Sequence, residues 1–260
     1  MKVVNAPVPA GSLQPSAGMA PLIALVGCDG AGKTTLAADL CAALAWYPAT
    51  YCYLGLGSRG IADRIARWPL VGRLLERRLS ARASQARSKG QKIPGLLTAL
   101  VIYAFSLLRL HRFRHMLQVR HDGQLAICDR YPQLDVAGFY DGPGLAAARA
   151  SGPVTAWLAR RERRLYERMV ACRPTVVIRL NIDVETALQR KPDHEVELLR
   201  QKVAATSMIR FNGATIVDVD ACQPYEQVRA EVMQIIQRVI QANRRKCPHS
   251  VVPAELAAAS

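Results

Sequence analysis

The sequence predicts an α/β fold with a mainly parallel sheet of five strands and helices on both of its faces. Short apolar runs, typical of strands buried on both faces, alternate along the chain with longer segments of helical periodicity. Such alternation indicates strands that are joined by helical crossovers and therefore pair in parallel. The segments with the strand pattern are residues 21–27, 51–56, 124–129, 175–182 and 214–220.

In the first half of the chain, the apolar run PLIALVG at 21–27 predicts a buried strand. A Gly-rich turn and the apolar-faced helix TLAADLCAAL follow it, and YCYLGL at 51–56 is the second strand. Residues 61–92 are rich in arginine and are expected to be helical in pieces. The apolar segment 96–118 is expected to be a buried core helix, because its uncharged stretch is too short to span a bilayer comfortably. A helix on a membrane surface is the alternative.

The second half of the chain repeats the alternation. The third strand, QLAICD, leads into a loop rich in Pro, Gly and Asp, and a basic helix is expected at 154–171. The fourth strand, TVVIRLNI, is followed by Asp183, which is expected to be the N-cap of VETALQR. A polar helix at 195–206 and the fifth strand precede a last helix that opens at Pro224 and has apolar residues at helical spacing.

Composition limits the class of protein. The chain has 260 residues and half of them are apolar, which is enough for one sizeable core and excludes a disordered chain or a small disulfide scaffold. The 35 Lys and Arg against 20 Asp and Glu give a net charge of +15, which indicates an anionic partner. The seven cysteines form no CxxC or CxxH pair, so we expect reduced thiols, no metal site built on them and a cytoplasmic location.

The chain divides into three parts. Residues 1–20 are expected to form a flexible leader, since they hold prolines and glycines and lack the apolar run of a secretory signal. Residues 21–242 are expected to form one domain. Residues 243–260 start with basic side chains and are expected to be a flexible tail.

The segment GCDGAGKT at 27–34 fits the pattern GxxxxGK[ST] of a phosphate-binding loop, or P-loop, between a strand and a helix. Its glycines allow a tight turn that brings backbone N–H groups against phosphate oxygens. Lys33 is expected to reach the β- and γ-phosphates of ATP, and Thr34 to offer its hydroxyl to Mg²⁺. The residues expected to contact ATP are Gly27, Asp29, Gly30, Ala31, Gly32, Lys33, Thr34 and Thr35.

The tripeptide DRY at 129–131 ends the third predicted strand. In an open parallel sheet, ligand groups gather at the carboxyl ends of the strands. Asp129 is therefore expected to bind Mg²⁺ or its waters together with Thr34, and Arg130 to bind a second phosphate.

Residues 188–206 follow the fourth strand and carry several basic side chains, among them Arg190, Lys191, Arg200 and Lys202. Such a segment is typical of a lid that folds over a nucleotide and neutralises the transferring phosphoryl group. The sequence thus predicts a small helical lid.

With these motifs the chain resembles the thymidylate kinase family of P-loop nucleoside monophosphate kinases. The resemblance rests on GCDGAGKTT at 27–35, DRY at 129–131, LNIDVETALQRK at 180–191 and the last strand with its helix. It covers roughly residues 21–242. It implies a P-loop NTPase fold, a homodimer, and an ATP- and Mg²⁺-dependent kinase that transfers the γ-phosphoryl group to a nucleoside monophosphate such as dTMP.

The resemblance also implies roles for single residues. Asp29 matches the loop acid that approaches the acceptor's sugar in the family, and Arg130 matches a contact to the acceptor phosphate. The loop has no arginine after its acid, as in the family branch whose catalytic arginines come from the lid, where Arg190 falls. The catalytic residues expected on this basis are Lys33, Asp29, Asp129, Arg130 and Arg190.

The acceptor side departs from the family pattern. PQLDVAGFYDGPGL replaces the thymine-reading residues after DRY, and YLGLGSRG replaces the Arg-Glu-Pro-Gly type motif after the second strand. Arg59 is then the candidate phosphate ligand, and Asp135 and Asp141 stand where thymine readers are missing. The residues expected to contact the acceptor are Asp29, Arg59, Arg130, Tyr131 and Asp135.

Two acceptor classes therefore stay open. An acceptor phosphate is already anionic and needs no strong base, whereas a hydroxyl of a sugar or surface-polysaccharide precursor must give up its proton. Asp29, Asp129 and Asp135 are the candidate bases. The DGPGL segment resembles thymidylate kinase-like proteins of bacterial surface-polysaccharide pathways.

The basic excess suggests further partners. A nucleic-acid-stimulated ATPase is a distant alternative, because residues 59–92 hold ten Lys and Arg but only Trp68 as an aromatic platform, so no specific nucleic acid is expected. The basic segments 59–92 and 109–120 flank the apolar helix, which predicts peripheral contact with the acidic inner face of a membrane.

Overall fold

A computed structural model describes most of the chain, and the structural statements below concern that part. The described residues are 19–55, 95–136, 141–146, 150–192 and 195–246. The predicted helical pieces at 61–92 and the side chain of Arg59 lie outside them.

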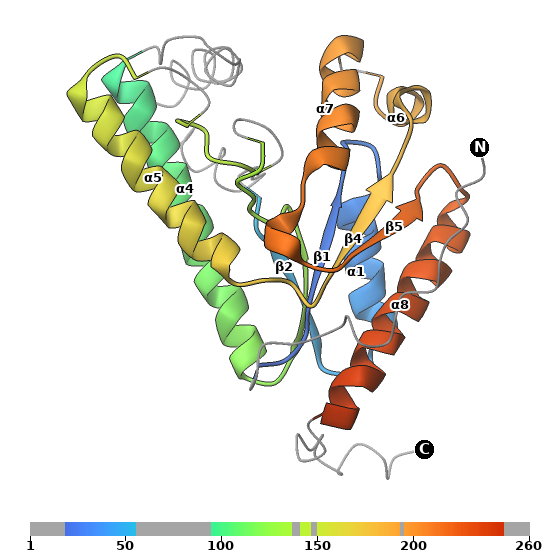
Figure 1. Ribbon diagram of the computed structural model, residues 1–260. Helices are drawn as coiled ribbons and strands as arrows, with labels where there is room; N and C mark the ends of the chain where they lie inside the picture. The colour runs from blue at the N-terminus through green and yellow to red at the C-terminus, as the bar shows by residue number, and fades with distance from the viewer. Residues whose placement is uncertain (1–18, 56–94, 137–140, 147–149, 193–194, 247–260) are drawn as a thin grey trace, which may run out of the picture.

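Five strands form one sheet in the order β2-β3-β1-β4-β5, and every neighbouring pair is parallel (Figure 1). The strands are β1 (Leu22–Gly27), β2 (Ala49–Tyr53), β3 (Leu125–Asp129), β4 (Val176–Asn181) and β5 (Ile216–Asp220). The predicted α/β architecture is confirmed. The second strand ends at Tyr53 and not at residue 56, because Tyr53 pairs with Asp129, the last residue of β3.

Helices cover both faces of this sheet (Figure 1). They are α1 (Lys33–Ala43), α4 (Leu96–His121), α5 (Pro153–Ala171), α6 (Val184–Arg190), α7 (Val196–Met208) and α8 (Tyr225–Lys246), with a short 3₁₀ turn, η1, at Phe211–Gly213. Asp183 caps α6 as predicted, since its carboxylate accepts a hydrogen bond from the Thr186 N–H at 2.6 Å.

Alternation along the central strand divides the core into two parts. Ile23 and Leu25 of β1 pack on one side with residues of α1 and α8. Leu22, Ala24 and Val26 point to the other side and pack with residues of α4 and α5. Because both faces of β1 are fully covered, the apolar run that predicted this strand is continuous.

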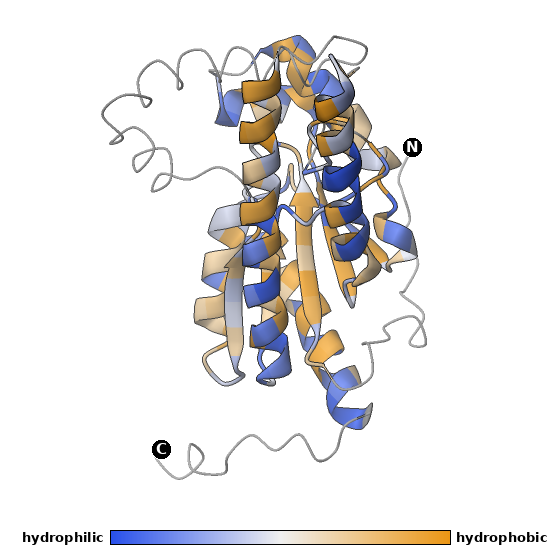
Figure 2. Ribbon diagram, turned by 90° about the vertical axis from the view of Figure 1, so that its left-hand side faces the viewer, coloured by the Kyte–Doolittle hydropathy of each residue, from blue (hydrophilic) through white to orange (hydrophobic). Residues whose placement is uncertain are grey.

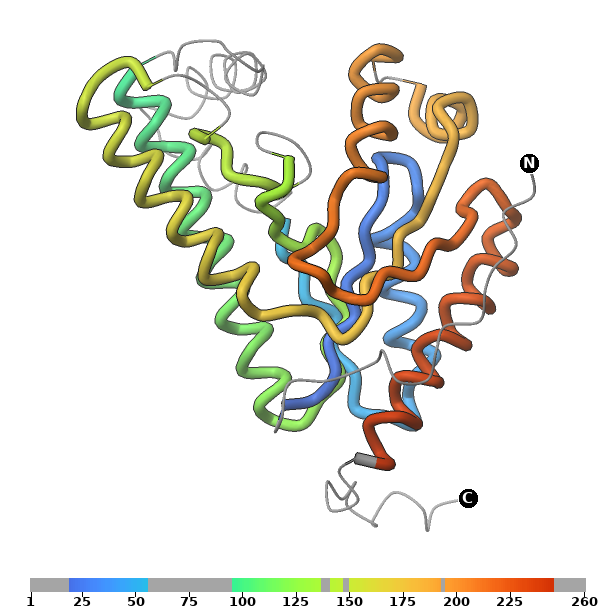
Figure 3. Tube along the Cα trace, in the orientation of Figure 1, coloured from blue at the N-terminus to red at the C-terminus, as the bar shows by residue number. Residues whose placement is uncertain are grey.

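The helices α4 and α5 pack side by side and begin at the same end of the molecule (Figures 1 and 3). From Arg109 onward, α4 is the core helix that the sequence predicts, with Phe113 and Met116 buried. Its first turns are apolar as well, but Leu97 there is 66% exposed. Figure 2 shows that the helix changes from hydrophobic residues in its first turns to a mixture of hydrophilic and hydrophobic residues in its later turns.

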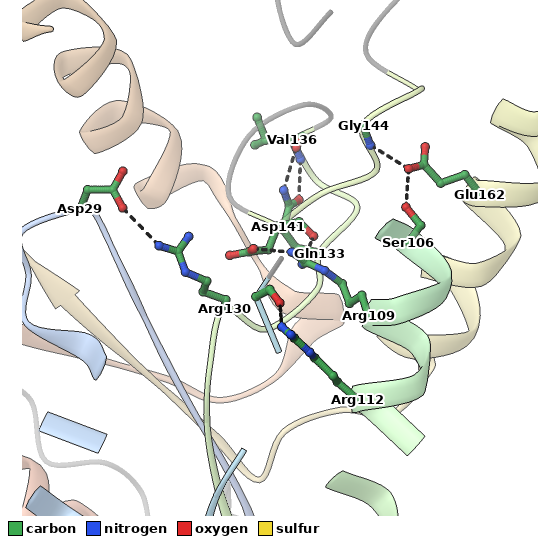
Figure 4. A network of polar contacts seen from close by, with 11 residues as sticks. Asp29, Ser106, Arg109, Arg112, Arg130, Gln133, Val136, Asp141, Gly144 and Glu162 are labelled. Atoms are coloured by element: carbon green, nitrogen blue, oxygen red, sulfur yellow. Dashed lines mark hydrogen bonds and ion pairs between the residues drawn. The ribbon is translucent and has the colours of Figure 1, made fainter. Parts of the chain in front are cut away.

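A buried carboxylate joins α5 to α4 and to the loop that follows β3. Glu162 accepts hydrogen bonds from the Ser106 hydroxyl at 2.6 Å, the Leu145 N–H at 2.7 Å and the Gly144 N–H at 3.1 Å (Figure 4). Burial raises the pKa of Glu162, and the three hydrogen bonds oppose that rise. The carboxylate thus positions the loop that carries Asp141 into the site described below.

We predict that Glu162→Ala lowers the free energy of unfolding by about 3–5 kcal/mol, because three donors lose their buried acceptor. Glu167→Ala on the same helix is the matched control. Glu167 is exposed and, among the described residues, pairs only with Arg163, so its removal should cost less than about 1 kcal/mol. Urea denaturation of the three proteins measures both values, and equal losses for the two variants would contradict the prediction.

Candidate phosphate-binding site

At two positions, the loop between β1 and α1 has a backbone conformation that only glycine adopts readily. Gly27 has φ 152° and Gly30 has φ 90°. A Cβ on Gly27 would lie 2.6 Å from the Leu180 carbonyl oxygen, and one on Gly30 would lie 3.1 Å from that of Ala187. The loop is therefore held tightly against β4 and α6, in the curved form that a phosphate-binding loop requires.

Lys33 is the first residue of α1, and its side chain is buried inside this loop. The ammonium group donates hydrogen bonds to the carbonyl oxygens of Gly27 at 2.9 Å and Cys28 at 2.7 Å. Burial lowers the pKa of Lys33 to about 8, and the nearby charge of Arg130 acts in the same direction. The result is a largely desolvated cation at the N-terminus of a helix, where a phosphate group is stabilised most strongly.

Thr34 connects α1 to the end of β3. Its hydroxyl donates a hydrogen bond to Oδ2 of Asp129 at 2.8 Å. Asp129 is fully buried, and its Oδ1 has no hydrogen-bond partner within the described ranges. Burial raises the pKa of Asp129, and the bond from Thr34 opposes the rise.

This pair of oxygen ligands fits Mg²⁺. A buried carboxylate oxygen without a partner is costly unless a ligand or ordered water satisfies it. The described residues contain no group of three or more His, Cys, Asp or Glu that could hold a metal ion by themselves. Mg²⁺ needs none, because it is commonly held by one or two protein oxygens together with substrate phosphates and water.

Asp29 links the loop to two basic residues from other elements. Its Oδ2 lies 2.5 Å from the Lys202 ammonium of α7, and its Oδ1 lies 3.6 Å from a guanidinium nitrogen of Arg130. Burial would raise the pKa of Asp29, but the hydrogen bond and charge of Lys202, with the charges of Lys33 and Arg130, lower it to about 2.

Two of the basic residues of the predicted lid, Arg190 and Lys202, lie against the loop, and Arg200 does not. Arg190 donates a long hydrogen bond, 3.4 Å, to the Gly30 carbonyl, so it lies against the loop. Arg200 instead pairs with Glu197 on the exposed side of α7. Lys202, which faces the loop, shares its side of the helix with buried Leu199 and Thr206, at a spacing of three and four residues. Arg200 and Lys202 both stand in the predicted lid, and the structure shows that Lys202 is the one that reaches the loop.

A cleft lies beside the loop at the carboxyl ends of β1 and β3. Its polar lining residues are Lys33, Arg130, Asp141 and Thr206. Arg130 and Asp141 both have positive φ, 56° and 66°, which is uncommon for residues other than glycine and is often found at functional sites.

A fully buried arginine of α4 holds the side chain and the backbone of Asp141 in place (Figure 4). Arg109 donates to Oδ1 of Asp141 at 2.6 Å and to its backbone carbonyl at 2.9 Å. Arg112, one turn further on, donates to the Gly55 carbonyl and lies 5.2 Å from the centre of the Tyr53 ring. The sequence did not single out either arginine for a site, because both stand in a helix that its apolar pattern assigns to the core.

Two residues expected to contact the acceptor have structural partners instead. Asp135 accepts hydrogen bonds through Oδ2 from the N–H groups of Arg210, at 2.9 Å, and Phe211, at 3.1 Å, and so fixes the turn before η1. Tyr131 borders the cleft, but its ring is buried against Phe211 and its hydroxyl donates to the Cys172 carbonyl. Asp29 and Arg130 do lie together beside Lys33.

A second, wider cleft opens on the other side of the loop and encloses about 250 Å³. It lies between the loop, Arg190 and the connection from β5 to α8, where Gln223 and Tyr225 line it. Gly30, Ala31, Gly32 and Thr35 of the predicted ATP-contacting set line this cleft as well.

Comparison with known proteins identifies relatives of the chain. No family model matches it. A protein of Escherichia coli K12, described as "uncharacterized ATP-binding protein YghR", is 44% identical over 227 residues, which are 86% of this chain and 90% of the relative. The "uncharacterized ATP-binding protein YghS" of the same strain is 42% identical over 223 residues, 85% of this chain and 92% of the relative. The chain belongs to the YghR/YghS family.

Membership in the YghR/YghS family, together with the five-stranded parallel sheet and the loop between β1 and α1, confirms the predicted P-loop NTPase fold. The two relatives are similar to this chain over nine-tenths of their own lengths. The family is therefore defined by the whole domain and not by the phosphate-binding loop alone.

For this YghR/YghS family member we predict an acid-sensitive contribution of Asp29 to stability. Its folded-state pKa of about 2 lies below the ordinary 3.8, so the contribution is present above pH 4 and is lost as the pH falls toward 2. Between pH 5 and pH 2, the wild-type protein should lose about 1–2 kcal/mol more of its unfolding free energy than Asp29→Asn. Urea denaturation at both pH values checks this.

Lys202→Met supplies the control for that measurement. Because Lys202 acts through Asp29, the substitution should cost less in the Asp29→Asn background than in the wild-type protein. If the unfolding free energies of the wild-type protein and Asp29→Asn changed equally with pH, the predicted contribution of the Asp29–Lys202 ion pair would be contradicted.

Proposed function

We propose that this protein is an ATP-dependent phosphotransferase that is similar to the thymidylate kinases and uses Mg²⁺·ATP as phosphoryl donor. The observation that carries the proposal is the contact of Thr34 with Asp129, at 2.8 Å, beside buried Lys33. The Oδ1 atom of Asp129 and the ammonium group of Lys33 are the groups that a P-loop enzyme offers to a metal and a triphosphate. The names of YghR and YghS, as ATP-binding proteins, support the choice of nucleotide.

In this proposal each residue around the loop has a separate role. Lys33 releases its two carbonyl partners and binds the β- and γ-phosphates, while Thr34 and Asp129 would hold Mg²⁺. Bound Mg²⁺ neutralises negative charge on the phosphates. Arg190 and Lys202 bring the positive charge of the lid to the same loop, where they stabilise the transferring phosphoryl group.

The positions of the two clefts support a division between donor and acceptor. The wider cleft, beside Gln223 and Tyr225, takes the nucleoside of ATP. The cleft with Arg130 and Asp141 lies next to Lys33 and takes the acceptor. An in-line transfer requires the two substrates to meet at the transferring phosphate, which Lys33 would bind between them.

A phosphate-bearing acceptor, such as a nucleoside monophosphate, is the leading candidate. Arg130 lines the cleft, and its ion pair with Asp29 is long, at 3.6 Å, so a ligand phosphate can replace it. Arg112 is half-buried and has no carboxylate partner within the described part of the chain. Arg130 lines the cleft together with Lys33, and these two cations favour an anionic ligand.

An acceptor hydroxyl, as in a sugar or a surface-polysaccharide precursor, is the second candidate. Asp141 favours it, because this carboxylate lines the cleft and Arg109 holds it through Oδ1 only. No contact to its Oδ2 forms among the described residues. A carboxylate fixed in this way can accept the proton of a hydroxyl nucleophile.

We predict that Lys33→Ala lowers ATP-dependent phosphoryl transfer about 100-fold or more, because the phosphates lose their buried cation. The measurement is ADP release in a coupled assay with dTMP, other nucleoside monophosphates and sugars as acceptors. Arg238→Ala, an exposed cation on α8, is the control and should change the rate less than about twofold. Unchanged turnover by Lys33→Ala would contradict the proposal, and stimulation by DNA or RNA alone would favour an ATPase.

A second prediction separates the acceptor classes. With a phosphate acceptor, Arg130→Gln should raise the KM for the acceptor about tenfold or more, whereas Asp141→Asn should change kcat by less than about tenfold. A fall of kcat by about 10²–10⁴ in Asp141→Asn would instead support the hydroxyl acceptor. Asp122→Asn, at the exposed end of α4, is the control, and thermal unfolding shows whether each variant is folded.

A further inference from the structure

The first half of α4 exposes several large apolar side chains. Leu96, Leu97, Leu100 and Leu107 are 47%, 66%, 46% and 44% exposed, and no charged residue occurs from 96 to 108. The same side of the helix then becomes polar and basic, with exposed His111 and Arg114. Figure 2 shows the change along one helix, from hydrophobic to hydrophilic.

The neighbouring helix extends this surface. Val154 and Trp157, in the first turns of α5, are 52% and 47% exposed. Since α4 and α5 begin at the same end of the molecule (Figures 1 and 3), the exposed residues of their first turns lie at that end, and Leu107 follows about three turns further along α4. We call this surface the apolar tip; it consists of Leu96, Leu97, Leu100, Leu107, Val154 and Trp157.

Positive charge borders the apolar tip. The next two turns of α5 expose Arg160, Arg161, Arg163 and Arg164. The guanidinium group of Arg161 lies 5.0 Å from the centre of the Trp157 ring. The acids of α5 offset little of this charge, because Glu162 is buried in the network with Ser106 and Glu167 pairs with Arg163.

We propose that the apolar tip docks on a membrane surface rich in anionic lipid. Leucine side chains and Trp157 would enter the boundary between headgroups and acyl chains, and the arginines of α5 would bind lipid phosphates. Exposed apolar patches rimmed by charge mark interaction sites, and the net charge of +15 gives this one a preference for an anionic partner.

The helix lies on the membrane and does not cross it. By length and composition alone, α4 is long and apolar enough to span a bilayer. Its uncharged part, 96–108, is only about 20 Å long, whereas a hydrocarbon core is about 30 Å thick. The opposite side of α4 is also packed into the protein, where Ala99, Phe113 and Met116 are buried.

Charge also distinguishes a lipid surface from a second copy of the chain. A two-fold symmetric dimer places the same patch on both sides of the interface, so each copy would bring the arginines that border the tip and the interface would carry their positive charge twice. Like charges that face each other across an interface oppose association. Anionic headgroups supply the opposite charge along the whole row.

Docking at this tip has a consequence for orientation. The tip lies at the same end of the molecule as α7 and the loop after β1 (Figure 1). A docked protein would therefore turn the end that carries the phosphate-binding loop toward the membrane. This consequence does not depend on which reaction the site performs.

Co-sedimentation of the full chain with vesicles tests the proposal. The wild-type protein should pellet with phosphatidylcholine vesicles that contain about 30% phosphatidylglycerol, and not with pure phosphatidylcholine. Binding should weaken as salt rises from about 0.1 M to about 0.5 M. Leu97→Glu/Leu100→Glu should lower the affinity for the anionic vesicles at least about tenfold. Arg160→Gln/Arg164→Gln should lower the affinity by a smaller factor, and this difference from the wild-type protein should disappear at high salt.

Trp46→Glu is the matched control, because Trp46 is 51% exposed but lies after the end of α1, outside the apolar tip. It should bind anionic vesicles as the wild-type protein does, and circular dichroism should show that all variants are folded. Absence of binding to anionic vesicles, or equal binding by Leu97→Glu/Leu100→Glu, would overturn the proposal. A dimer in sedimentation velocity that this double variant converts to a monomer, without vesicle binding, would assign the tip to a second copy.

Discussion

The buried ammonium group of Lys33 is the constraint around which the rest of the site is arranged. It is held by the carbonyls of Gly27 and Cys28, and it stands where α1 begins. Placing a cation there requires the glycine turns of the loop and brings the next residue, Thr34, onto Asp129 at the end of β3. A desolvated charge is costly unless it is compensated, and a phosphate is the ligand that compensates it best.

The sequence predicts the parts of this arrangement that local patterns encode. Lys33, Thr34 and Asp129 were predicted together because a loop motif and a strand end place them, and each strand was visible as an apolar run. The parts that depend on packing were not predictable. Periodicity alone cannot show that Lys202 and not Arg200 meets Asp29, or that Asp135 caps a turn.

The basic residues of the chain fall into groups with different surroundings. Some arginines are structural: Arg109 is buried against Asp141, and Arg120 is fully buried with its Nε donating to the Ala20 carbonyl. Others surround the phosphate-binding loop. A third group, on α5, borders the apolar tip that we propose as a membrane-docking surface. The ten Lys and Arg of residues 59–92 lie outside the described part of the chain.

Calorimetric titration of Mg²⁺·ATP at pH 7 and pH 9 tests most directly whether Lys33 is the phosphate ligand. Because the pKa of Lys33 is about 8, the ammonium group loses its charge between pH 7 and pH 9 in the free protein. Bound phosphates stabilise the charged form, so Lys33 stays protonated in the complex. The affinity should therefore fall about tenfold at pH 9, with uptake of about one proton on binding. Lys33→Arg should abolish this pH dependence, because its charge is permanent. Equal affinities at both pH values, with no proton uptake, would contradict the account.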